Sequence, residues 1–266
     1  MQLTVQLYKM RVIHEAPVRY FLQSQPEDIP LNTWIGLPLE IDFKGEIHCI
    51  HCGRLIKKTY GQGYCYPCFL SVPETSECVL RPELCQAHLG ISRDMEWSKE
   101  HCLQDHFVYL ALTSAVKIGV TRSSQIPERW IDQGAWKAIR FARTPNRHTA
   151  GLIEVALKNH LPDKTNWRHM LTDKKDDNLN LLEIKATASK WIPGDLSHFF
   201  TNDDTIATIE YPVSFYPSSV HQLNLLNTPS FKGILAGIRG QYLIFQDGTV
   251  FNVRAHQGHV VNLTVG

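Results

Sequence analysis

Alternating apolar and polar positions near the N-terminus predict strands. Leu3, Val5 and Leu7 alternate with glutamine and threonine residues, and residues 37–43 alternate in the same way. A period of two places successive side chains on opposite faces of a sheet. We therefore expect residues 1–45 to form a small sheet, the N-terminal β segment, which carries no recognisable chemistry.

The middle of the chain predicts strands and helices in the order ββαβα. The expected elements are two strands over 107–112 and 115–120, a helix over 124–133, a strand over 137–143 and a helix over 147–161. The first helix has Ile126 and Trp130 at helical spacing, and Gly134 follows it as a C-terminal cap. In the second helix we expect one side to carry Leu152, Val155, Ala156 and Asn159.

The last third of the chain predicts one helix and then strands. A helix is expected over 180–191, and strands are expected over 206–211, 233–237, 241–245 and 250–253. Asp247-Gly248 lies between the last two strands and is typical of a hairpin turn. Gly233, Gly237 and Gly240 favour sharply curved strands of the kind found in small barrels.

Composition is typical of a globular protein, and the predicted strands and helices together indicate the α+β class. The chain has 266 residues, of which 43% are hydrophobic and 20% are charged. It has no apolar run long enough for a membrane span, and no apolar signal segment opens it. We expect a cytoplasmic protein with no membrane association. Its expected segments are the N-terminal β segment (1–45), a zinc-binding region (46–104), an α/β domain (105–175) and a helix with a β-rich C-terminal domain (176–266).

Four cysteines form two CxxC pairs. The pairs are Cys49-Ile-His-Cys52 and Cys65-Tyr-Pro-Cys68, separated by twelve residues. Two such turns supply the four thiolates that a tetrahedral structural zinc requires. A disulfide is disfavoured in a reducing cytosol, and a redox site needs one CxxC rather than two. The neighbouring His48 and His51 are competing ligands, but thiolates are the better donors.

A second cysteine group follows the first. Its members are Cys78, Cys85, His88 and Cys102, and Cys85-Gln-Ala-His88 has the spacing of one turn of a metal site. Only the fold can bring the other two cysteines to this turn. We expect a second zinc here. The alternative is that Cys78 and Cys102 are small buried hydrophobic residues, which is a common role for free cysteine.

Positive charge is concentrated in residues 105–175. This stretch has twelve Lys or Arg and six Asp or Glu, a net charge of +6, whereas the whole chain has a net charge of +1. Such a segment is typical of a phosphate-binding surface, although an ordinary solvated face has the same composition. The candidate nucleic-acid-binding residues are Arg122, Arg140, Arg143, Arg147 and Arg168.

The same segment resembles the GIY-YIG nuclease superfamily. The resemblance rests on Val108-Tyr-Leu110, on Lys117-Ile-Gly-Val-Thr121, on Arg129 in the first helix and on Glu154 in the second. Two positions depart from the superfamily pattern. Val108 replaces the first glycine, and Lys117 replaces the second tyrosine.

The resemblance implies roles for three of the four candidate catalytic residues, and lysine chemistry suggests one for Lys117. Tyr109 would position the attacking water or the scissile phosphate, and Arg129 would stabilise charge on the phosphate, with Arg122 as the alternative residue for this role. Glu154 would bind a divalent metal such as Mg²⁺. Lys117 would act as a general base or bind phosphate as a point charge. Each residue also has a structural alternative, such as an ion pair between Glu154 and Lys158.

The whole chain also resembles an uncharacterised bacterial family of unknown function. This resemblance rests on the stretches GYCYPCF, PELCQAHLG, RWIDQGA and GIRGQYLIF, and it implies no activity. Three functions follow from the sequence. They are a zinc-stabilised nucleic-acid-binding protein with metal-dependent endonuclease activity, a non-catalytic RNA- or DNA-binding module, and a zinc-dependent assembly factor that binds a protein partner through the C-terminal β-rich segment.

Overall fold

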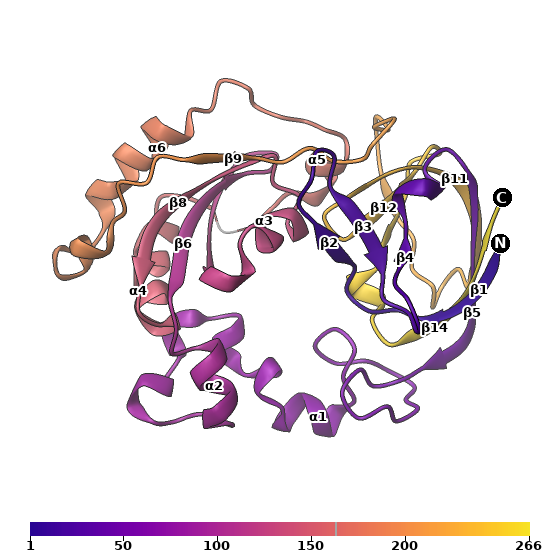
Figure 1. Ribbon diagram of the computed structural model, residues 1–266, viewed down its shortest axis with the longest axis horizontal. Coiled ribbons are helices and arrows are strands. Elements are labelled where there is room, and N and C mark those ends of the chain that lie inside the picture. The colour runs from indigo at the N-terminus through magenta and orange to yellow at the C-terminus, as the bar shows by residue number, and fades with distance from the viewer. Residues whose placement is uncertain (163) are drawn as a thin grey trace. The chain divides into compact units, whose positions relative to one another are not determined.

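The computed structural model describes residues 1–162 and 164–266. Helices and sheets are both present, which confirms the α+β class (Figure 1). Backbone contacts divide the chain into two units. Unit 1 comprises Met1–Leu70, Leu171–Asp173 and Ile209–Gly266, and unit 2 comprises Ser71–Met170 and Lys174–Thr208. The first cysteine group therefore belongs to unit 1 and the second to unit 2.

Unit 1 contains a seven-stranded sheet that joins both ends of the chain. Its strands, in spatial order, are β1 (Gln2–Gln6), β14 (His259–Val265), β5 (Pro38–Ile47), β11 (Ser230–Arg239), β12 (Tyr242–Phe245), β13 (Thr249–Asn252) and β10 (His221–Gln222). All neighbours are antiparallel except β10 and β13. A second sheet consists of β2 (Arg11–Ile13), β3 (Arg19–Leu22) and β4 (Ile29–Pro30).

Two glycines shape the C-terminal strands of unit 1. Gly248 has φ +88° in the turn between β12 and β13, and Asp247 Oδ1 accepts a hydrogen bond from Thr249 N at 2.8 Å. The predicted hairpin is therefore present. In β11 the register shifts between Leu235 and Gly237. A Cβ at Gly237 would lie 2.5 Å from Val213 Cα, so a side chain is excluded there.

Unit 2 contains a four-stranded antiparallel sheet. Its order is β7 (Val116–Arg122), β6 (His106–Leu112), β8 (Lys137–Thr144) and β9 (Ile206–Thr208). Helix α3 (Glu128–Asp132) follows β7, and α4 (Arg147–Lys158) follows β8. The chain order β6, β7, α3, β8, α4 is the ββαβα order expected from the periodicity. Helix α3 is shorter than expected, because a 3-10 turn over Ser123–Gln125 precedes it.

One face of this sheet packs on α4. The helix contributes Ala150, Ile153 and Leu157 to a core that also contains Val108, Leu110, Ile118, Ile139 and Phe141. The side expected to carry Leu152, Val155, Ala156 and Asn159 is not the side that the helix buries. Leu152 and Val155 are 39% and 41% exposed, and Asn159 lies beyond the last helical residue. The true buried stripe passes through Ala150, Ile153 and Leu157, which are spaced three and four residues apart.

The remaining helices are short. They are α1 (Tyr66–Ser71), α2 (Met95–His101), α5 (Trp167–Leu171) and α6 (Leu181–Ala188), together with 3-10 turns that include η2 (Pro73–Thr75), η3 (Glu77–Val79), η4 (Pro82–Leu84) and η5 (Ala87–Leu89). Across residues 1–162 and 164–266, no helix combines the length and hydropathy that a membrane span requires.

We predict that Gly119→Ala destabilises unit 2. Gly119 lies opposite Tyr109 in the β6–β7 pair, and a Cβ at Gly119 would lie 2.4 Å from the Tyr109 hydroxyl oxygen. Tyr109 is fully buried and has no room to move aside. The free energy of unfolding, measured in urea, is expected to fall by about 1–3 kcal/mol. The control Gly194→Ala meets no atom within 4 Å. Equal stability of the two variants would contradict this packing.

Candidate metal centres

The first cysteine group has the geometry of a tetrahedral zinc site. The sulfur atoms of Cys49, Cys52, Cys65 and Cys68 all lie within 4.8 Å of one another. Cys52 Sγ and Cys65 Sγ are 3.8 Å apart. A tetrahedron with Zn–S distances of about 2.3 Å separates its sulfurs by about 3.8 Å, whereas a disulfide needs about 2 Å. The spacing therefore fits four thiolates around one ion.

Backbone donors favour the thiolate form of Cys49, whereas burial and hydrogen bonds to the other three cysteines raise the pKa of Cys68 to about 12. Cys65 N donates a hydrogen bond to Cys49 Sγ at 3.2 Å. Burial opposes ionisation of Cys49, but hydrogen bonds from the backbone of Cys52, Cys65 and His51 outweigh it and lower the pKa of Cys49 to about 6. Zinc binds the thiolate, so this environment suits a ligand. His48 hydrogen-bonds Glu46 at 2.6 Å and the carbonyl of Gly53 at 2.8 Å, which leaves the thiols as the donors.

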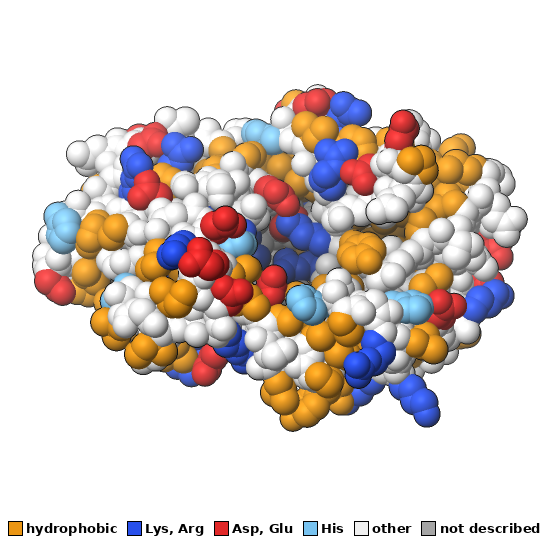
Figure 2. Space-filling model, turned by 60° about the horizontal axis from the view of Figure 1, so that its bottom comes forward, with side chains coloured by type: hydrophobic (Ala, Val, Ile, Leu, Met, Phe, Trp, Pro, Cys, Tyr) orange, Lys and Arg blue, Asp and Glu red, His pale blue; other side chains and the backbone are white. Residues whose placement is uncertain are grey.

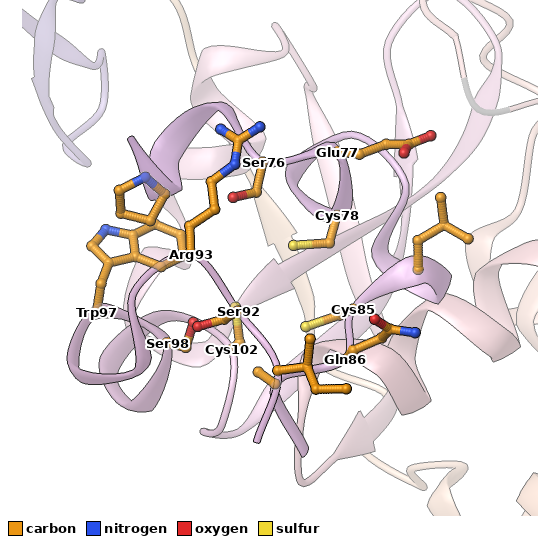
Figure 3. A pocket seen from close by; sticks show the side chains of 14 residues that line it. Ser76, Glu77, Cys78, Cys85, Gln86, Ser92, Arg93, Trp97, Ser98 and Cys102 are labelled. Carbon is orange, nitrogen blue, oxygen red and sulfur yellow. The ribbon is translucent and has the colours of Figure 1, made fainter. Parts of the chain in front are cut away.

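The second cysteine group contains three residues rather than four. The sulfur atoms of Cys78, Cys85 and Cys102 lie within 4.8 Å of one another, and they converge on a pocket (Figure 3). The predicted ligand His88 does not join them, which corrects the expected set. The 3-10 turn Ala87–Leu89 buries Ala87 and leaves His88 exposed, with its ring stacked on His148 at a centroid distance of 4.4 Å.

Helix α4 positions the three thiols, a role that the sequence analysis missed. Arg147 Nη1 donates to the carbonyl of Cys78 at 3.2 Å, and Nη2 donates to the carbonyl of His101 at 3.0 Å. Turn η4, which leads into Cys85, packs directly on the helix at Gly151. A Cβ at Gly151 would lie 2.1 Å from Glu83 N. In the sequence, the only signal for this close approach was Gly151, a glycine inside a predicted helix.

Ionisation is favoured at Cys85 and disfavoured at the other two thiols of this group. Hydrogen bonds from Cys102 and Cys78 lower the pKa of Cys85 to about 2, and the charge of Arg147 acts in the same direction. The pKa of Cys78 rises in turn, because its hydrogen bonds to Cys102 and Cys85 favour the protonated form. The group therefore supplies a thiolate beside further soft sulfur donors, which is the donor set that zinc prefers.

Two of the residues predicted to be catalytic, Arg129 and Glu154, act electrostatically on a third, the buried phenol of Tyr109. Tyr109 donates a hydrogen bond to Gln133 Oε1 at 2.7 Å. Burial raises the pKa of Tyr109, while the charge of Arg129 lowers it and that of Glu154 raises it, so both groups act on the phenol. Glu154 is 6% exposed and pairs with Lys158 at 3.3 Å. Lys117 is also buried, opposite Ala111 in the same strand pair as Tyr109.

The candidate phosphate-binding arginines have different surroundings. Arg143 is exposed and pairs with Asp105, and Arg140 pairs with Asp203 at 2.9 Å. Arg168 is exposed and lies over the Trp167 ring at 4.4 Å. Arg122 is half-buried, and both burial and the charge of Arg147 lower its pKa. Figure 2 shows basic and acidic side chains interspersed over the visible face.

The fold and the thiol groups define an α+β protein with two cysteine clusters suited to metal binding. A family model described as "Protein of unknown function (DUF2797)" matches residues 36–261. The match spans more than half of the chain, so the chain belongs to this family. No curated protein and no solved structure matches the chain.

We predict that the protein as purified contains about two zinc ions per chain. The two clusters are separate, so Cys65→Ser and Cys102→Ser should each lower the zinc content by about one, as measured by atomic emission. Each variant is the control for the other. A wild-type protein without zinc, or a Cys65→Ser variant with the full content, would contradict the assignment.

Proposed function

We propose that this protein is a zinc-stabilised nucleic-acid-binding protein. The four-thiol cluster holds a structural zinc, and the basic segment of unit 2 binds the phosphates of RNA or DNA. The observation that carries the proposal is the arrangement of cationic and aromatic side chains on the face of the unit 2 sheet opposite its apolar core.

A bulge in β8 brings two arginines to this face. Arg143 lies opposite Phe107, and Arg140 lies opposite Tyr109, with a register shift between the two pairs. In a regular strand, residues three apart point to opposite sides, so the extra residue of the bulge places both arginines beside the aromatic residues of β6. The Arg140 guanidinium lies 5.1 Å from the centre of the Phe107 ring.

The ion pairs of these arginines leave them available to phosphate. The Arg143 side chain is 65% exposed and its partner Asp105 is 40% exposed, and Arg140 and its partner Asp203 are 40% and 32% exposed. An exposed pair of this kind contributes about 0–1 kcal/mol, so a phosphate can replace the carboxylate at little cost. Phe107 adds aromatic surface on which bases can stack. Cationic and aromatic side chains together are the features that single-stranded nucleic acid requires.

We expect Arg140→Ala combined with Arg143→Ala to weaken nucleic-acid binding. Removal of two phosphate contacts should reduce the slope of log Kobs against log salt by about 2. The measurement is fluorescence anisotropy with labelled mixed RNA and DNA pools at several salt concentrations.

The matched control for this double variant is Arg81→Ala combined with Lys99→Ala. Arg81 and Lys99 are also exposed and ion-paired in unit 2, with Glu77 and Glu96 respectively. An equal loss of binding in both double variants would show that the effect depends on total charge and not on this face. No salt-dependent binding by the wild type would overturn the proposal.

Metal-dependent cleavage of the bound strand is a second candidate function. It is favoured by the grouping of Arg129 and Glu154 around Tyr109, because both charges act on the same phenol. Burial keeps Tyr109 protonated, and its hydroxyl donates to Gln133, so Tyr109 would not take a proton. Arg129 would offset charge on the phosphate. Glu154 would hold Mg²⁺, which supplies charge stabilisation at a phosphodiester when it is bound.

We predict that Glu154→Gln abolishes Mg²⁺-dependent cutting of a mixed nucleic-acid pool while the chain stays folded. The amide keeps the shape of the side chain but loses the charge that binds the cation. Glu96→Gln is the control, because Glu96 is an exposed partner of Lys99 on α2. Cutting by Glu154→Gln at the wild-type rate would reject the role of Glu154. Salt-dependent binding without any cutting would identify a binding module.

A further inference from the structure

The three sulfur atoms of the second cysteine group open onto a pocket of about 340 Å³. Cys78, Cys85 and Cys102 all line it, and Figure 3 shows their sulfur atoms directed into the space. The walls combine apolar and polar side chains. The apolar ones include Leu84, Ile91 and Trp97, and the polar ones include Ser92, Arg93 and Ser98.

The protein supplies this group with three ligands only. Among residues 1–162 and 164–266, no fourth His, Cys, Asp or Glu has a ligand atom within 4.8 Å of all three sulfurs. Glu77 lines the pocket, but its carboxylate pairs with Arg81 at 3.2 Å. Zinc takes four ligands. Zinc sites in which the protein supplies all four ligands are structural, whereas sites with three protein ligands keep one position for an exchangeable ligand.

We propose that the three-thiol group holds a zinc ion whose fourth position opens into the pocket and binds a small thiol as its thiolate. The inference rests on the zinc content of the proposed function and is independent of nucleic-acid binding. Binding forms one Zn–S bond and displaces a coordinated water. The thiol proton goes to solvent, and no electron is transferred.

The surroundings select a thiol over harder ligands. A metal with three sulfur donors is soft and favours a fourth sulfur. Four thiolates around Zn²⁺ carry a net charge of −2, and the guanidinium of Arg147, which donates to the carbonyl of Cys78, offsets part of it. Leu84, Ile91 and Trp97 give the carbon body of the thiol an apolar wall.

Cobalt substitution tests the proposal directly. Co²⁺ replaces Zn²⁺ in tetrahedral thiolate sites and absorbs visible light, so its spectrum reports the ligands. The four-thiol cluster has no position for an added ligand, so any spectral change on titration with 2-mercaptoethanol comes from the three-thiol group. We expect a saturable change that increases sulfur-to-cobalt charge-transfer absorption in the full-length protein loaded with two cobalt ions.

Variants at Ser92 separate binding in the pocket from a general effect of thiols. Ser92 is an exposed residue of the pocket wall, and it is not one of the sulfur ligands. Ser92→Trp should fill the pocket and raise the apparent Kd for 2-mercaptoethanol by at least about tenfold, which is about 1.4 kcal/mol. Ser92→Ala should bind like the wild type. Both variants should still take up two metal ions.

Four results would overturn the proposal. They are a content of one metal ion per chain, a two-cobalt spectrum that does not respond to thiol, equal affinities in Ser92→Trp and Ser92→Ala, and iron–sulfur absorption in the purified protein. The salt dependence of nucleic-acid binding, measured on the same preparation, tests the nucleic-acid-binding part of the proposed function separately. A loss of thiol binding with that salt dependence intact would therefore reject this inference alone.

Discussion

In our proposal, residues 49–102 hold a defined structure because their cysteine sulfurs coordinate metal ions. This stretch buries little apolar surface. Leu80 is 84% exposed and Leu89 is 64% exposed, and η2 to η5 are single 3-10 turns. The small core at its end consists mainly of Cys85, Ala87 and Cys102. A chain with so few apolar contacts needs cross-links, and thiolate–metal bonds would supply them.

Helix α4 connects three features of unit 2, which are its apolar core, the segments that carry the three thiols and the buried phenol of Tyr109. Ile153 anchors the helix in the apolar core, Arg147 and Gly151 position the segments that carry the thiols, and Glu154 acts on Tyr109. Twelve residues therefore set the geometry of the three-thiol group and of the phenol group together.

Local patterns allowed part of this structure to be predicted. The spacing of Cys49, Cys52, Cys65 and Cys68 indicated the four-thiol group because each CxxC turn is a local structure. Period-two and helical patterns gave the order of elements from β6 to α4. The sequence could not exclude His88, since only the turn at Ala87–Leu89 directs its ring to the surface. It also could not show that Arg147 contacts backbone carbonyls, because the partners are far apart in the chain.

The central claim is that the cysteines bind zinc in one four-thiolate site and one three-thiolate site. X-ray absorption at the zinc edge, on full-length protein prepared without chelator or added thiol, measures the atoms around the metal. One site supplies four sulfur ligands and the other supplies three, so the average is about 3.5 sulfurs per zinc. A nitrogen or oxygen atom completes the three-sulfur site. A first shell dominated by nitrogen and oxygen, or a protein without zinc, would contradict the account.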